Sequence, residues 1–287
     1  MIGYNPKRSY RRNRIMKKVV TIQDISCFGK CSTTVALPVI SAMGVECAVI
    51  PTAVLSTHTA GFHGFTFRDL TEDIPAVTDH WKREGLTFDG LYTGYLGSPE
   101  QAAMIEDFID KIGPRCVFVD PAMADNGKLY TGFGPEIVDA MRHLCGRADV
   151  IVPNITEAAL MMGAEYREPG SYDEAYIRDL LVRLTENGAK TAAITGVRLK
   201  DRPGEQGIMA YSRESGQFTE YFHEHLPVSF HGTGDLFAAV MFAALILGKP
   251  LRDAMRIAAS NVLNSIRATV DDPTTATVSS SSCAFRT

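Results

Sequence analysis

Apolar runs alternate with amphipathic stretches along residues 17–270. The runs are short, rich in β-branched residues and mostly free of polar interruptions, which is typical of strands buried on both faces. Such strands, separated by helices, indicate a parallel sheet that is covered on both sides. We predict strands at 17–25, 46–55, 88–96, 116–121, 149–154 and 191–196.

Residues typical of helix starts and helix ends occur between these predicted strands. The segment 98–113 has Ser98 as an N-cap, Pro99 in the first turn and Gly113 as the stop. Further helices are predicted at 31–44, 236–250 and 251–270, and a hairpin is predicted at 208–226, turning at 214–216. The pattern therefore predicts an α/β fold: a single three-layer α/β/α domain with a mostly parallel central sheet.

Polar residues stand where the predicted strands end. In parallel α/β sheets, ligands bind outside the carboxyl ends of the strands, so these side chains should line one rim. The residues at these positions are Asp24, Ser26, Tyr95, Asp120, Asn154, Glu157 and Thr195.

The stretch HGTGDLFAAV (231–240) places a glycine turn and an aspartate at the start of a predicted helix. A helix N-terminus presents free N–H groups, and glycines let the backbone approach an anion, so Gly232, Thr233 and Gly234 could cradle a phosphate. Asp235 should stay ionised beside the positive end of the helix dipole. A base beside an anion cradle fits phosphoryl transfer. The alternative is a helix start with no catalytic role.

Further carboxylates suggest a metal site on the same rim. Asp120 ends a strand and Asp125 follows in a glycine-containing loop. Mg²⁺ binds through one or two carboxylates and several waters, although Asp125 could equally belong to a plain turn. Asn154 and Glu157 have the spacing of a capping box, and near a nucleotide they could serve phosphate and hydrated metal. Neither a GxxxxGK[ST] loop nor a GxGxxG motif occurs in the sequence.

Composition narrows the class of protein. The chain has 287 residues, 45% of them hydrophobic and 22% charged, with a formal net charge of −4. This charge gives no support to nucleic-acid binding, and no apolar run is long enough to span a membrane. The scattered cysteines suggest reduced thiols and a cytoplasmic protein. We expect a basic, disordered extension at 1–16, one domain at 17–270 and a frayed tail at 271–287.

Four motifs in this order resemble the pyridoxal kinase family of the ribokinase superfamily: IQDISCFGKCS, DPAMADNGKLY, PNITE and GTGDLFAA. The resemblance implies a ribokinase-like sandwich and ATP-dependent phosphorylation of the 5'-hydroxymethyl group of vitamin B6. It also implies Mg²⁺, often a monovalent cation (K⁺ or Na⁺), and a homodimer. Val152 departs from the threonine that the family often has before its Pro-Asn pair, which weakens the case for the monovalent cation.

The resemblance also implies roles for individual residues. Asp235 would be the catalytic base, and Gly232, Thr233 and Gly234 would form the anion hole. The vitamin would be bound by Ser26, Leu55, Thr59, Tyr95 and Asp235. ATP would be bound by Asp125, Asn154, Glu157, Thr195 and Thr233, and metal by Asp120, Asp125 and Glu157. The segment 57–65, which contains Gly61 and Gly64, would be a flap over the substrate. Asp24 departs from the family's usual serine, and Lys30 and Cys31 receive no role.

Two other functions compete with this interpretation. A hydroxymethylpyrimidine kinase of the same superfamily also holds a flat ring with a hydroxymethyl arm, but its glycine turn usually carries a cysteine where this chain has Asp235. A vitamin- or nucleotide-binding module without catalysis is the non-enzymatic alternative. The presence of Asp125, Asn154, Glu157 and Asp235 together argues against it.

Overall fold

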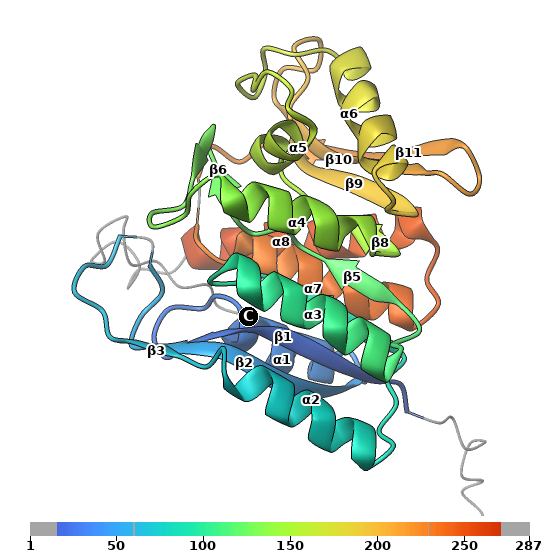
Figure 1. Ribbon diagram of the computed structural model, residues 1–287. Helices are drawn as coiled ribbons and strands as arrows, with labels where there is room; N and C mark the ends of the chain where they lie inside the picture. The colour runs from blue at the N-terminus through green and yellow to red at the C-terminus, as the bar shows by residue number, and fades with distance from the viewer. Residues whose placement is uncertain (1–15, 60, 229, 271–287) are drawn as a thin grey trace, which may run out of the picture.

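The computed structural model describes residues 16–59, 61–228 and 230–270. The predicted extension at 1–16, except for Met16, and the predicted tail at 271–287 lie outside the described residues. Strands and helices alternate through most of the described chain, and the strands line up in one large sheet between two layers of helices (Figure 1).

Nine strands form the sheet in the order β11-β10-β9-β8-β5-β4-β1-β2-β3. The six strands from β9 to β2 in this order pair in parallel, and the antiparallel strands β3, β10 and β11 lie at the two edges. The predicted α/β class with a mostly parallel sheet is thus confirmed. The bounds are β1 Lys18–Ser26, β2 Glu46–Leu55, β3 Phe67–Asp69, β4 Gly90–Thr93, β5 Val117–Val119, β8 Val150–Ile151, β9 Thr191–Val197, β10 Glu205–Ser212 and β11 Gln217–Glu224.

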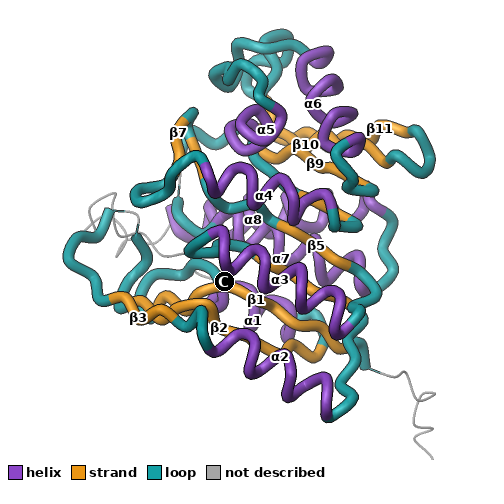
Figure 2. Tube along the Cα trace, viewed as in Figure 1, coloured by secondary structure: helices purple, strands orange, loops and turns teal. Residues whose placement is uncertain are grey.

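Helices cover both faces of the sheet (Figure 2). One face packs against α2 to α6, and the other packs against α1, α7 and α8. Apolar strand residues are consequently buried on both sides, as the unbroken hydrophobic runs require. The helices are α1 Thr33–Ala42, α2 Asp73–Arg83, α3 Pro99–Ile112, α4 Glu136–Gly146, α5 Ile155–Met162, α6 Glu174–Glu186, α7 Thr233–Ile246 and α8 Leu251–Val270.

The helix signals in the sequence act as predicted at α3. The Ser98 side chain accepts a hydrogen bond from the Gln101 N–H, and Gly113 ends the helix in a left-handed conformation with φ of 65°. The hairpin at the other end of the domain also forms, with β10 and β11 joined at residues 213–216.

Three very short elements were not predicted from the sequence. Besides β3, the strands β6 Ala124–Asp125 and β7 Lys128–Leu129 form a separate two-stranded sheet. Asn126 and Gly127 turn this hairpin with φ of 51° and 74°. Elements of two or three residues are too short to show a hydrophobic period, so only the Asp-Asn-Gly turn could be identified in advance.

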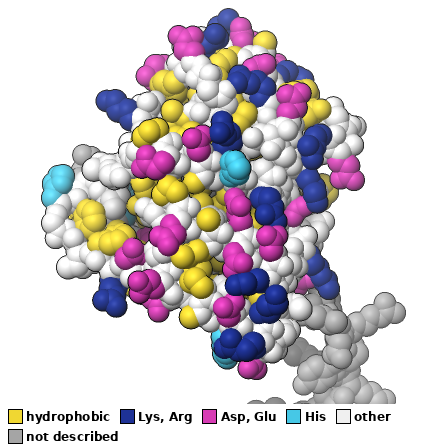
Figure 3. Space-filling model, in the orientation of Figure 1, with side chains coloured by type: hydrophobic (Ala, Val, Ile, Leu, Met, Phe, Trp, Pro, Cys, Tyr) yellow, Lys and Arg dark blue, Asp and Glu magenta, His cyan; other side chains and the backbone are white. Residues whose placement is uncertain are grey.

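The molecular surface matches the composition. Acidic and basic side chains are interspersed on the face seen in Figure 3. Within the described ranges, no helix is both long and apolar enough to cross a membrane.

Candidate active site

The glycine turn before α7 is held tightly against the loop between β1 and α1. Gly232 is the N-cap of α7 and has φ of 84°. A Cβ placed on it would lie 2.0 Å from the Lys30 carbonyl oxygen, so only glycine fits. The Thr233 hydroxyl donates to the Phe230 carbonyl at 3.0 Å. At Gly234 no atom lies within 4 Å of an added Cβ, so this position offers open space for an approaching anion.

Asp235 lies in the first turn of α7, directly behind this cradle. Burial raises the pKa of its carboxyl to about 7, the Ser32 N–H hydrogen bond opposes the rise, and the charge of Asp24 adds to it. Burial thus opposes the helix dipole, which we predicted would keep Asp235 ionised. A carboxyl with this pKa is well matched to general base catalysis near neutral pH.

Asp24 is a second buried carboxyl beside Asp235, and it was not among the predicted contacts. Its side chain is 3% exposed, and the Ser26 hydroxyl donates to its Oδ2 at 3.0 Å. Burial raises the pKa of Asp24, and its charge contributes to the raised pKa values of Asp235 and Tyr95. Asp24 is therefore close enough to both residues to affect their pKa values. A carboxylate inside an otherwise apolar strand was the signal for it in the sequence.

Aromatic side chains form a wall on the same rim. The Tyr95 ring stacks on Phe133, with centroids 5.4 Å apart and planes 20° from parallel. Phe133 was not predicted, because no motif marks it. Leu55 is buried at the end of β2, whereas Thr59 is exposed. The predicted roles of Ser26, Leu55, Thr59 and Tyr95 stay predictions.

The predicted flap packs against the glycine turn through a cluster of rings. His58 is 5% exposed and lies 4.9 Å from Phe62 and 5.4 Å from His231, measured between ring centroids. Phe62 in turn makes an edge contact with Phe28 in the loop after β1, at 6.0 Å. His58 and Phe62 thus touch both the loop after β1 and the residue before the glycine turn, and the role of this segment as a flap stays a prediction.

Asn154 and Glu157 form the capping box of α5. The Asn154 side chain accepts from the Glu157 N–H at 3.0 Å, and Glu157 Oε2 accepts from the Asn154 N–H at 2.8 Å. Glu157 Oε1 also accepts from Met123 N–H at 3.1 Å and from Ala124 N–H at 3.5 Å. Both oxygens of this carboxylate are therefore engaged by the backbone, which leaves little free capacity for direct metal coordination.

Asp120 is the carboxylate that best fits a metal. Within the described part of the chain, no hydrogen bond reaches its side chain, and burial followed by the charge of Asp235 raises its pKa. Asp125 is exposed and accepts from the Asn126 N–H at 2.8 Å. The described residues contain no group of three or more His, Cys, Asp or Glu close enough to hold an ion. This donor set fits Mg²⁺ that takes most of its ligands from nucleotide and water.

Thr195 lies at the carboxyl end of β9, beside Asn154 in a parallel bridge. Its N–H donates to the Pro153 carbonyl at 2.9 Å, which fixes the strand end next to the start of α5. The structure thus brings Asn154, Glu157 and Thr195 together on one part of the rim, whereas Thr233 lies at the start of α7. Their contacts with ATP stay predictions.

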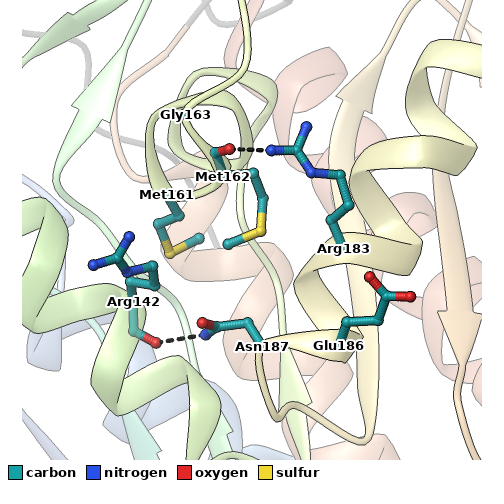
Figure 4. Close-up of a pocket in the computed structure, with 7 residues that line it drawn as sticks. All are labelled: Arg142, Met161, Met162, Gly163, Arg183, Glu186 and Asn187. Atoms are coloured by element: carbon teal, nitrogen blue, oxygen red, sulfur yellow. Dashed lines mark hydrogen bonds between the residues drawn. The ribbon is translucent and has the colours of Figure 1, made fainter.

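One surface pocket lies elsewhere, among α4, α5 and α6, with a volume of about 380 Å³ (Figure 4). Arg183 donates to the Met162 carbonyl at the end of α5, and Asn187 donates to the Arg142 carbonyl at 2.8 Å. These contacts join the carboxyl-terminal ends of α5 and α6 to α4, away from the rim. None of the predicted site residues lines this pocket.

A mostly parallel sheet between two helix layers, with a glycine turn and an aspartate opening a helix at its rim, defines a ribokinase-like kinase, a class of phosphotransferases. The sequence profile described as phosphomethylpyrimidine kinase matches residues 35–276, so the chain belongs to this family.

Relatives and solved structures agree with this assignment. The chain is 29% identical to a pyridoxine/pyridoxal/pyridoxamine kinase of Bordetella avium, over 88% of this chain and 85% of that one. It is 27% identical to the hydroxymethylpyrimidine/phosphomethylpyrimidine kinase of Bacillus subtilis, over 76% and 78%. Pyridoxal kinase from Lactobacillus plantarum superposes with a TM-score of 0.83 at 33% identity, covering 94% and 93%. A Bacteroides thetaiotaomicron protein classed as a phosphomethylpyrimidine kinase, crystallised with pyridoxal, superposes at 0.84 with 38% identity, covering 90% of each chain.

Proposed function

We propose that this protein transfers the γ-phosphoryl group of ATP to the 5'-hydroxymethyl group of a B6 vitamer. The observation that carries the proposal is the carboxyl of Asp235, which has a pKa of about 7 and lies directly behind the Gly232-Thr233-Gly234 turn. A carboxyl poised to take a proton beside an anion cradle is what transfer to an alcohol needs. The solved structure of a 38% identical relative with pyridoxal supports the choice of vitamer.

The base and the anion cradle act together in one transfer step. Asp235 takes the proton of the substrate hydroxyl, the hydroxyl oxygen bonds to the γ-phosphorus, and the bond from that phosphorus to the ADP oxygen breaks. Backbone N–H groups of the glycine turn and the start of α7 stabilise charge on the phosphoryl oxygens. Asp235, now protonated, releases the proton to solvent after the product leaves.

The nucleotide would lie on the side of the rim formed by β5, α5 and β9. Asp125, Asn154, Glu157, Thr195 and Thr233 are its expected neighbours. Mg²⁺, when bound, neutralises charge on the phosphates. Asp120 would hold it directly, and Glu157 would act through water because its oxygens accept backbone N–H groups. A homodimer, a monovalent cation and a cytoplasmic location stay predictions.

The vitamer ring would lie against the aromatic wall. The stacked pair of Tyr95 and Phe133 offers a flat apolar surface, and the buried carboxyl of Asp24 offers one polar contact. Large planar surfaces with few polar groups bind flat heterocycles better than polyols. Phosphorylation of a sugar is therefore not proposed.

Hydroxymethylpyrimidine phosphorylation is the second candidate, favoured by the match to the phosphomethylpyrimidine kinase profile over 35–276. Asp235 in the position of that family's usual cysteine argues for the vitamer. Initial-rate assays with ATP and either pyridoxal, pyridoxine, pyridoxamine or hydroxymethylpyrimidine decide between the two. A higher kcat/KM for the pyrimidine would replace the first proposal, and ligand binding without phosphate transfer would replace both with a binding module.

Asp235→Asn tests the role of the base. Removal of a general base is expected to lower kcat by about 10²–10⁴-fold. Thermal stability should be retained or increased, because the amide carries no charge into this buried position. ATP affinity, measured by calorimetry, should stay within about threefold of the original protein if Asp235 acts only on the alcohol. A kcat near that of the original protein would refute the assignment.

A further inference from the structure

Tyr92 is a fully buried tyrosine directly beneath the candidate site, and neither the motifs nor the proposed function gives it a role. It lies on β4, and its side chain is 0% exposed. Its ring packs between Phe118 of β5, at 5.6 Å, and Phe242 of α7, at 5.7 Å. Three aromatic rings from three elements thus fix the direction in which the hydroxyl points.

The residues that follow these rings toward the rim form a second layer. Asp120 comes two residues after Phe118, on the same face of the β5 chain. Asp235 comes seven residues before Phe242, which is two turns earlier on the same face of α7. Gly94 comes two residues after Tyr92. Toward the rim, Phe118 is followed by the carboxylate of Asp120, and Phe242 by that of Asp235. Tyr92 is followed by Gly94, which has no side chain.

The Tyr92 hydroxyl extends into the space that Gly94 leaves. A Cβ on Gly94 would lie 3.7 Å from the Tyr92 hydroxyl oxygen and 2.5 Å from Gln23 Oε1. The parallel register pairs Ile22 with Thr93 and Thr93 with Val119, so Gly94 stands between Gln23 and Asp120 in the sheet. The hydroxyl consequently lies in the layer of the two carboxylates. In agreement, burial and then the charges of Asp120 and Asp235 raise the pKa of Tyr92.

No described residue satisfies this hydroxyl. The Tyr92 oxygen and Gln23 Oε1 are both buried without a hydrogen-bond partner in the described part of the chain. The other polar end of Gln23 is engaged, because its Nε2 donates to the Thr21 hydroxyl at 2.7 Å. A buried donor without a partner destabilises a protein, so such a group at an active site needs an explanation. Beneath two carboxylates, of which Asp235 accepts only the Ser32 N–H and Asp120 accepts no hydrogen bond from a described residue, a donor that can rotate about its C–O bond has an evident use.

We propose that Tyr92 is a positioning residue whose hydroxyl donates a hydrogen bond to the Asp120–Asp235 pair when nucleotide and alcohol occupy the site. The proposal rests on the proposed kinase function. The donor holds the base and its neighbouring carboxylate in a fixed arrangement at the moment of transfer. Gly94 is required because any side chain there would occupy the space between donor and carboxylates.

The test replaces the hydroxyl and keeps the ring. Tyr92→Phe is expected to lower kcat about tenfold while KM for ATP and for the vitamer changes less than about threefold, because orientation and not binding is lost. The melting temperature should stay equal or rise, because the hydroxyl has no partner in the resting structure. Tyr176→Phe on α6 is the matched control: it removes a hydroxyl that donates to the Glu165 carbonyl in the loop before α6, and kcat should not change.

Amino-acid analogues at position 92 keep the test decisive if the phenylalanine variant packs poorly. With 4-methylphenylalanine, which keeps the shape and lacks the donor, kcat should fall as in Tyr92→Phe. With 4-aminophenylalanine, which restores a donor, kcat should return to within about threefold. Unchanged kcat in the two donor-less variants, or a lower melting temperature with normal kcat, would overturn the proposal. Failure of the unmodified protein to phosphorylate any vitamer or pyrimidine would instead refute the proposed function.

Discussion

The carboxylates at the α5 side and at the α7 side of the candidate site differ in the hydrogen bonds that they accept. At the start of α5, the oxygens of Glu157 accept hydrogen bonds from three backbone N–H groups, and Asn154 closes the capping box. Near the start of α7, Asp235 accepts a hydrogen bond from the Ser32 N–H. Within the described residues, the Asp120 side chain accepts no hydrogen bond. Glu157 is also the more deeply buried, at 2% exposed, whereas Asp120 and Asp235 are half-buried, so the two sides differ in hydrogen bonds and in access from solvent.

This contrast separates architecture from chemistry. A fully satisfied carboxylate fixes the position of a helix and a loop, and changing it costs stability. Burial raises the pKa of Glu157, Asp120 and Asp235 alike, so the pKa does not separate the two sides. A carboxylate with few donors keeps its oxygens free for a substrate or a metal. In the proposed function, the α5 side would position the nucleotide, whereas the α7 side would supply the base. Three changes can break or sharpen this comparison.

The largest effect is expected for Gly232→Ala on the α7 side. An added Cβ would lie 2.0 Å from the Lys30 carbonyl, and φ of 84° is unfavourable for alanine. Displacement of one anion-hole donor should lower kcat by about 10²–10³-fold. Gly248→Ala at the end of α7 is the control, because its φ of 80° imposes the same strain but no atom lies within 4 Å. Equal kcat in both variants would show that the close approach at Gly232 has no part in catalysis.

The pH dependence of kcat/KM is the next effect. The base must be ionised, so the pKa of about 7 at Asp235 predicts a half-maximal kcat/KM near this pH. Each further unit of acidification should lower kcat/KM about tenfold. A profile that is flat from about pH 5 to pH 8 would contradict this assignment.

Stability should have the opposite pH dependence. Because the pKa of Asp235 is raised on folding, the folded chain binds this proton more tightly than the unfolded chain. Its contribution to stability is present in acid and is lost as the pH rises through about 7. As the pH rises toward about 7, the melting temperature of Asp235→Asn should therefore fall less than that of the original protein.

The smallest effect is expected for Glu157→Gln on the α5 side, and it should appear in stability. The glutamine amide has one acceptor oxygen and one NH₂ group, and the NH₂ group cannot accept an N–H bond. The free energy of unfolding, measured by urea denaturation, should therefore fall by about 1–3 kcal/mol. Glu186→Gln, at an exposed position in the last turn of α6, should leave it within about 0.5 kcal/mol. A kcat loss larger than the loss at Asp235 would reverse the roles of the two sides.

Regular elements with strong local signals were predictable. The strand at 46–55 and the helix cap at Ser98 follow directly from hydrophobic runs and capping chemistry. The strand predicted at 88–96 is limited to Gly90–Thr93, because beyond Thr93 the chain turns to form the rim. Of the β6–β7 hairpin, only the turn could be predicted from the sequence. Asp235 and the glycine cradle were identified from four letters and their position before a helix.

The sequence by itself determined the fold class and the rim, and it singled out Asp235 as the proposed base, because each depends on local periodicity or on a short contiguous motif. Tertiary structure alone decided the raised pKa of Asp235, the engagement of Glu157 by Met123 and Ala124, and the place of Phe133 and Tyr92. These properties depend on burial and on neighbours from distant segments. Neither solvation nor long-range contact is encoded at one position of the chain, so both appear only after folding.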